Sequence, residues 1–293
     1  MESSQSGLVN IMETGENSYV WIFLNSSLAQ GSPWGALTLL FLFFGRFLPI
    51  IALSPFFGSR ILPHPTKVAF AICMFVIFLP VLVGQITTPM EFNSWTIVLI
   101  LKEIFIGLVL GFLMSTPFTI VQNVGIIIDH QRGGASLMVN DPTIQNQSSP
   151  LGTLFNMVLI YIFYVIDGPF LFLDAIVSSY EIVPPDKMLN AALFNKDTPF
   201  FTLFIDFLNR FMVITLQLSA PALLCILMTD LFLGIANRLA PQVQITFLGM
   251  PLKSLLALAI ICIGWQLFSE AMTKQLYVWL NVCKDVLRMF VTT

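Results

Sequence analysis

Charged side chains interrupt two long apolar stretches of this 293-residue chain. Lys102 and Glu103 lie in residues 95–128, and Asp206 and Arg210 lie in residues 198–236. An ionised side chain at the centre of a bilayer costs about 2.5–3.5 kcal/mol even on the lenient insertion scale. We therefore expect these four side chains to face protein or water rather than lipid. Their chemistry would be ion pairing, or the coupling of ion movement to transport.

The two pairs differ in how well their members can satisfy each other. Asp206 and Arg210 are four positions apart, so they share one helix face and can pair. Lys102 and Glu103 are adjacent and point about 100° apart around a helix. We expect this second pair to satisfy itself poorly and to need outside partners. A location of Lys102 and Glu103 at the membrane interface is the alternative explanation.

Catalytic chemistry has little support in the sequence. His64 and His130 lie in different links and lack the HExxH spacing of a zinc site. No GxSxG elbow, P-loop or GxGxxG motif is present. The cysteines have no metal-binding spacing. Asp129, His130 and Asp141 fall in a polar loop without an evident nucleophile. We therefore predict neither an enzyme nor a metal or cofactor site.

The loop of residues 129–150 holds a short apolar patch, Leu137-Met138-Val139. Long loops in compact architectures tend to be functional or disordered. A solvated linker would expose these three side chains, so we expect them to be buried, plausibly in a pore. A local hairpin tucked under the protein surface is the alternative. Gly133 and Gly134 precede the patch and would give the loop hinge freedom.

The composition indicates an integral membrane protein. Hydrophobic residues make up 57% of the chain and charged residues 10%, whereas soluble domains have about 45–50% and 25%. The net charge of −3 and the scattered lysines and arginines argue against nucleic-acid binding. The acidic N-terminal segment lacks the basic start of a secretory signal.

Six apolar blocks cover residues 34–53, 68–86, 95–128, 151–180, 198–236 and 243–268. None alternates with the period of a strand, so the predicted fold is all-α. The third and fifth blocks are longer than the roughly 20 residues that span a bilayer. Gly107, Gly111 and Ser115 form a small-xxx-small ladder that allows close helix packing.

Charges in the short links conflict with simple crossings. Residues 54–67 and 237–253 carry basic side chains and no acid, which predicts a cytoplasmic location. Residues 1–18 and 87–94 are acidic and would face the other side. Six plain crossings would then leave the basic C-terminal tail outside. Either one block is re-entrant or double, or the blocks are not simple crossings.

Several motifs resemble the FliR/SctT family of type III secretion export-gate subunits. The first is the run Asn237-Arg238-Leu239-Ala240-Pro241-Gln242, which continues at Gly249-Met250-Pro251-Leu252-Lys253. The others are Arg46, Ser54-Pro55, Pro63, Lys67, Gly111-Phe112, Gly125 and Asp141-Pro142. The matches lie in order across residues 34–268 and are specific when taken together.

The resemblance implies an all-α integral membrane protein, with about six long apolar segments that form bent helical hairpins in a helical export gate. The gate would lie in the bacterial inner membrane and conduct unfolded proteins. Its partners would be two smaller gate subunits in multiple copies, a switch subunit and the secreted proteins. The first four blocks would match the larger partner's fold, and the last two the smaller partner's.

The same resemblance assigns roles to two segments. Residues 136–150 would be the plug that closes the channel, with Leu137, Met138 and Val139 as its apolar seal. The plug site also takes in Asn140, Asp141 and Pro142. The link of residues 237–253 would form the cytoplasmic entrance and meet the switch subunit, through Arg238, Pro241, Pro251 and Lys253. Arg238 and Lys253 are equally explained as ordinary determinants of orientation. We also expect Pro251 to break its helix.

These inferences divide the chain into an acidic tail with a short interfacial helix (1–33), a four-segment core (34–235) with the plug loop at 129–150, a basic link with the last hairpin helix (236–268) and a C-terminal tail (269–293). The predicted function is a non-enzymatic pore subunit, of an injecting rather than a flagellar apparatus. A secondary transporter with the four charges as coupling residues is the alternative. A membrane scaffold without a transport path is a third possibility.

Overall fold

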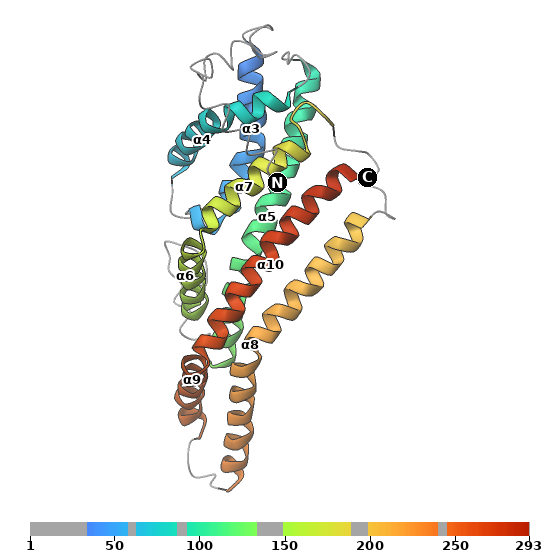
Figure 1. Ribbon diagram of the computed structural model, residues 1–293. Coiled ribbons are helices and arrows are strands. Elements are labelled where there is room, and N and C mark those ends of the chain that lie inside the picture. Colours follow the sequence, from blue (N-terminus) through green and yellow to red (C-terminus); the bar gives the residue numbers. More distant parts are fainter. Residues whose placement is uncertain are drawn as a thin grey trace. The chain divides into compact units, whose positions relative to one another are not determined.

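The computed structural model describes residues 34–57, 63–86, 93–133, 149–188, 199–239 and 245–292. All regular structure in these ranges is helical, which confirms the all-α prediction (Figure 1). The helices are α3 (Trp34–Leu53), η1 (Pro55–Phe57), α4 (His64–Gln85), α5 (Ser94–Gln131), α6 (Pro150–Val165), α7 (Gly168–Ile182), α8 (Pro199–Leu239), α9 (Ile245–Ile263) and α10 (Trp265–Thr292). The tail and interfacial helix predicted for residues 1–33 lie outside the described residues.

Four of these helices are long and apolar enough to cross a membrane: α3, α4, α5 and the Phe204–Leu239 part of α8. Two further pairs, α6 with α7 and α9 with α10, pass the same test together but bend at a short break. The α9–α10 bend is 68°. The number of spans reaches six if each bent pair is one span. The predicted bent segments are thus confirmed.

Contacts between Cα atoms divide the chain into two compact units. Unit 1 contains α3, η1, α4, the part of α5 up to Met114, residues 171–195 and residues 283–293. Its core forms around α3, whose Phe43 and Phe47 side chains are buried and stack with ring centroids 4.9 Å apart. Phe43 also stacks on Tyr180 of α7, at 6.0 Å. These aromatic contacts hold α3 against α7.

Close backbone packing of α3 against α5 depends on the predicted glycine ladder. A Cβ atom added to Gly107 would lie 2.3 Å from the backbone oxygen of Arg46, and one added to Gly111 would lie 3.1 Å from that of Pro49. No side chain fits at the first position unless the two helices separate. The small-residue ladder therefore does what the sequence predicts at Gly107 and Gly111.

Unit 2 contains α5 from Ser115, α6, α8, α9 and α10 up to Val282. In this unit α8 and α9 pack along each other (Figure 1). Pro251 lies inside α9 and does not break it, so that prediction is wrong. A proline inside a helix removes one backbone hydrogen bond, and the packing of α9 along α8 outweighs this loss.

Residues 269–292 of the predicted C-terminal tail lie in α10. Met272, Leu276 and Trp279 are buried at helical spacing, and the Trp279 ring meets Phe207 of α8 edge-on at 4.9 Å. This spacing of apolar residues is what stabilises an amphipathic helix.

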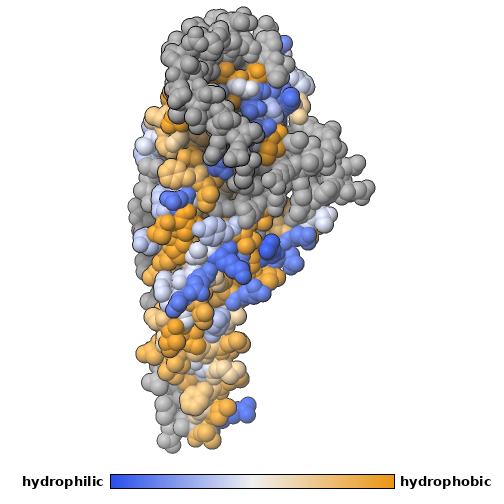
Figure 2. All heavy atoms as spheres, viewed as in Figure 1, coloured by the Kyte–Doolittle hydropathy of each residue, from blue (hydrophilic) through white to orange (hydrophobic). Residues whose placement is uncertain are grey.

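Apolar side chains dominate the surface of unit 2 where α9 and the second half of α8 lie (Figure 2). Large exposed side chains follow α8 along most of its length: Phe204, Ile205, Leu208, Met212, Val213, Leu216, Leu224, Leu227, Met228, Leu231, Phe232 and Ile235. A continuous apolar surface of this extent is covered by lipid or by protein partners.

Candidate functional site

The two ends of the segment between α5 and α6 meet at Asp129, whose side chain is only 1% exposed. Its carboxylate accepts a hydrogen bond from the hydroxyl of Ser149 and another, of 3.0 Å, from the backbone N–H of Leu151. It also pairs with Arg132, whose Nε and Nη2 atoms both lie 2.7 Å from Oδ1. The prediction that Asp129 lies in a polar loop is wrong, because α5 continues to Gln131 and buries this side chain.

Ser149 connects Asp129 to the start of α6. It is the N-cap residue of this helix, and its side-chain oxygen accepts the N–H of Gly152 at 2.9 Å. Pro150 follows as the first helical residue, a position that proline favours. The negative charge of Asp129 also suits a helix N-terminus, where the macrodipole is positive. These contacts hold the end of α5 close to the start of α6, on either side of the segment 134–148. We call the four residues that make them the loop base: Asp129, Arg132, Ser149 and Leu151.

The loop base also contacts α9. Arg132 donates a 2.9 Å hydrogen bond from Nη1 to the hydroxyl of Ser254. Gly133 has a φ of +88°, a left-handed conformation that favours glycine, and a Cβ atom here would lie 3.6 Å from Cγ of Met250. Next to Ser254, Lys253 forms an ion pair with Asp230 of α8. Within unit 2, polar contacts therefore run from the loop base through α9 to α8.

The predicted plug residues cannot be placed at this base. Leu137, Met138, Val139, Asn140, Asp141, Pro142 and Gly134 all lie outside the described residues. Of the two predicted hinge glycines, only Gly133 lies within the described residues, with the left-handed conformation given above. The plug and the hinge stay predictions.

The predicted entrance residues are spread over two helices. Arg238 is exposed in the last turn of α8, and Pro251 is exposed on α9. Lys253 is paired with Asp230, as described above, and Pro241 lies outside the described residues. The cytoplasmic entrance stays a prediction.

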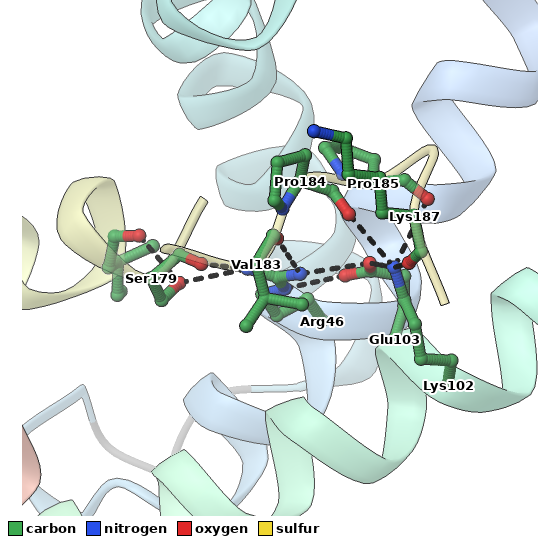
Figure 3. A network of polar contacts seen from close by, with 9 residues as sticks. Arg46, Lys102, Glu103, Ser179, Val183, Pro184, Pro185 and Lys187 are labelled. Carbon is green, nitrogen blue, oxygen red and sulfur yellow. Dashed lines mark hydrogen bonds and ion pairs between the residues drawn. The ribbon is translucent and has the colours of Figure 1, made fainter. Parts of the chain in front are cut away.

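A second polar cluster lies in unit 1, where Arg46 of α3 meets Lys102 and Glu103 of α5 (Figure 3). All three residues are buried. Glu103 accepts hydrogen bonds from Nε and Nη2 of Arg46, at 2.5 and 2.9 Å, and its Oε1 lies 2.8 Å from Nζ of Lys102. The expectation that Lys102 and Glu103 satisfy each other poorly is wrong, because the flexible lysine side chain bends back to its neighbour.

The remaining donors of this charge network bind backbone carbonyls. Arg46 donates to the oxygens of Ser179 and Val183 at 2.7 and 2.8 Å. Lys102 donates to the oxygens of Pro184 and Pro185 at 3.1 Å, and of Lys187 at 2.8 Å. Arg46 and Lys102 share the carboxylate of Glu103, and the charge of Asp186 also attracts Lys102. The two cations lie at the C-terminal end of α7, where the macrodipole is negative. The partners that this pair needs therefore come from the same chain.

Asp206 and Arg210 behave differently. Both are exposed on α8, and no ion pair joins them in the part of the chain that the structure describes. No group of three or more histidine, cysteine, aspartate or glutamate side chains that could hold a metal ion occurs among the described residues.

The sequence contains signals for the positions of Arg46 and Ser149 in these two clusters. Arg46 carries the only charge of its apolar block, and the cost of burying it would have suggested pairing with Glu103. Ser149 followed by Pro150 at the start of an apolar run is a typical N-cap signal.

Comparison with known proteins identifies the family. The family model described as "Bacterial export proteins, family 1" matches residues 37–277. The chain is 33% identical to the secretion system apparatus protein SsaT of Salmonella typhimurium, over 59% of this chain and 64% of that protein. It is 29% identical to the Yop proteins translocation protein T of Yersinia pestis, over 80% and 88%. The identity to the flagellar biosynthetic protein FliR of Bacillus subtilis is 31%, over 72% and 80%.

These matches confirm the resemblance to the FliR/SctT family, and the apolar helices fit a multi-pass membrane protein. The match to SsaT covers a little less than two thirds of that protein, whereas the other two matches cover most of theirs. The family match covers most of this chain, residues 37–277, and the chain therefore belongs to the bacterial export proteins of family 1.

Proposed function

We propose that this chain is a pore-forming core subunit of a type III secretion export apparatus. It conducts unfolded proteins across the bacterial inner membrane, and the segment 136–150 plugs the channel. The family match and the names of the relatives support a role in protein export. The observation that supports the plug is the loop base, because it fixes on α5 and α6 the two residues that flank the segment 134–148. In the sequence this segment contains the apolar residues 137–139.

The plug would work by excluding water. A group of apolar side chains dewets a constriction, so a pore wide enough for a polypeptide need not leak ions. An arriving chain displaces the segment, which afterwards returns to its place on the fixed base. Opening is then a two-state change that the substrate biases.

The partners in this proposal are the two smaller gate subunits, in several copies, and the switch subunit. The exposed apolar side chains along α8 are the surface that such subunits and lipid would cover. Relatives from both secretion systems and flagella match, so the matches do not choose between an injecting and a flagellar apparatus. We favour an injecting apparatus because of the loop and tail pattern in the sequence. The subunit is structural and has no catalytic role.

The secondary-transporter alternative finds no support in the charge network. Coupling residues must bind and release an ion or a proton, whereas Glu103 is held by Arg46 and Lys102, and both cations are held by backbone carbonyls. This arrangement suits a fixed structural role.

The test of the proposed function is deletion of residues 137–142. We expect the inner membrane to leak ions while the complex still assembles, as measured by a potential-sensitive dye and by co-purification of the partner subunits. The matched control replaces Gln145, Asn146 and Gln147 of the same loop by serine, which removes no apolar group and leaves the membrane tight. An equally tight membrane in the deletion strain, with normal assembly, would refute the plug.

A further inference from the structure

The contact between Arg132 and Ser254 joins two parts of unit 2 that the sequence keeps far apart. Arg132 ends α5, and Ser254 lies 122 positions later in α9. The Asp129–Arg132 pair, by contrast, lies within one helix end, at a spacing of three. A movement of α9 relative to α5 would therefore stretch or break the Arg132–Ser254 hydrogen bond and leave the Asp129–Arg132 pair intact.

The next residues of α9 are tied to α8. Lys253 pairs with Asp230, and the Cβ position of Gly249 lies 3.2 Å from a methyl group of Leu233. Met250, on the same turn, approaches Gly133. Residues 249–254 thus contact the loop base on one side and α8 on the other. Because packed helices move as rigid elements, a shift of the α8–α9 pair changes the position of Ser254 and Met250 together.

We propose that Arg132 and Ser254 are positioning residues that couple the α8–α9 pair to the loop base. A partner or substrate that moves α8 and α9 breaks the Arg132–Ser254 bond, while Asp129 keeps Arg132 and Ser149 together. The loop base is then released from α9 without coming apart. This inference rests on the proposed function, because the segment held by the base must be the plug.

The test compares Ser254→Ala with Ser254→Thr in the assembled complex. The alanine variant loses the acceptor for Arg132, and the threonine variant keeps a hydroxyl group. A hydrogen bond to a charged group shifts an equilibrium about tenfold or more, so we expect about a tenfold rise in ion leak for Ser254→Ala. Ser254→Thr stays near the unmodified protein. The control is Ser269→Ala, because the Ser269 hydroxyl donates only to the backbone oxygen of Gln266 in its own helix.

A second measurement applies if Ser254→Ala lowers assembly. In a cysteine-free background, Arg132→Cys and Ser254→Cys are joined by a short, reducible bifunctional thiol reagent. We expect the linked complex to stop exporting, to remain ion-tight, and to regain export after reduction. Linking Asp230→Cys to Lys253→Cys, which fixes α8 to α9 without touching the loop base, leaves export unchanged.

The outcomes separate this inference from the proposed function. If Ser254→Ala leaks no more than Ser269→Ala, or if the linked complex exports normally, the coupling is refuted. If deletion of residues 137–142 leaves the membrane tight, the plug is refuted whatever the Ser254 variants do. If the deletion leaks and the Ser254 variants do not, the plug stands and only the coupling fails.

Discussion

The substitution Glu103→Gln removes the negative charge that Arg46 and Lys102 share in unit 1, while keeping the shape of the side chain. Glu103 accepts two hydrogen bonds from Arg46 and lies in contact with the ammonium group of Lys102. A glutamine can accept at one of its two positions only. At the other, its NH₂ group would face the donors of Arg46 or Lys102.

The magnitude follows from the burial of all three residues. Removing one partner of a buried ion pair costs about 3–5 kcal/mol, because a charge is left without compensation. Here two cations share the lost anion, so we expect a value in the upper part of this range. Proteins are stable by only about 5–15 kcal/mol. Glu103→Gln should therefore remove a third or more of the stability.

The assay is unfolding in mixed micelles with increasing SDS, together with the amount of protein found in the membrane. The control is Glu181→Gln, the same chemical change at an exposed position of α7, which should shift stability by less than about 0.5 kcal/mol. An unfolding midpoint for Glu103→Gln equal to that of Glu181→Gln would refute the reasoning.

A triple change of Arg46, Lys102 and Glu103 to leucine separates pairing from carbonyl binding. In other proteins, apolar replacement of a complete buried ion pair is often neutral. Here it would also strip the carbonyls of Ser179, Val183, Pro184, Pro185 and Lys187 of their donors. Unsatisfied buried polar groups cost about 1–3 kcal/mol each. We therefore expect the triple variant to be no more stable than Glu103→Gln, and full recovery would contradict the role of these carbonyl bonds.

Two further predictions concern helix packing and capping. Gly107→Ala places a Cβ atom 2.3 Å from the backbone oxygen of Arg46, so α3 and α5 must separate, at a cost of about 1–3 kcal/mol in the same unfolding assay. The control is Gly84→Ala, which has no atom within 4 Å of the new Cβ and should be neutral or slightly stabilising. Equal stability of the two variants would contradict the close approach of the helices. Ser149→Ala removes the N-cap of α6 and one hydrogen-bond donor to Asp129, which should cost about 1–2 kcal/mol of stability. A protease should then cleave the segment 134–148 more readily, whereas the control Ser219→Ala in α8 should leave cleavage unchanged. An unchanged cleavage rate for Ser149→Ala would count against the loop base.

The parts of the structure that follow from local patterns were predictable. The apolar blocks and the close approach at Gly107 depend on residue types within a few turns of one another. The breaks that bend α6 with α7 and α9 with α10 lie inside predicted blocks, and only the family resemblance indicated bent segments. The burial of Asp129 depends on where α5 ends. The sequence marks this end poorly, because the groups that stabilise the Asp129 carboxylate, Ser149 and the N–H of Leu151, lie about 20 residues later. Pro251 was expected to break α9 because the stabilising contact with α8 is not visible in its own sequence.

The charge network shows where sequence reasoning stops. The apolar setting of Lys102 and Glu103 predicts that they need partners, and this is correct. Their partner Arg46 is 57 positions away from Glu103, and the carbonyls lie more than 80 positions from Lys102. Only the fold brings these groups together, and no periodicity in a single sequence reports such a distance.

The length of α8 has a consequence for the life of the protein in the cell. A helix of 41 residues is about 60 Å long at 1.5 Å per residue, which is twice the roughly 30 Å thickness of the hydrocarbon core. Lipid can therefore cover only part of its apolar surface. A newly made copy without partners would present the rest to water and become a target for proteases and aggregation. We expect the amount of this subunit to be limited by the supply of its partners rather than by its own synthesis.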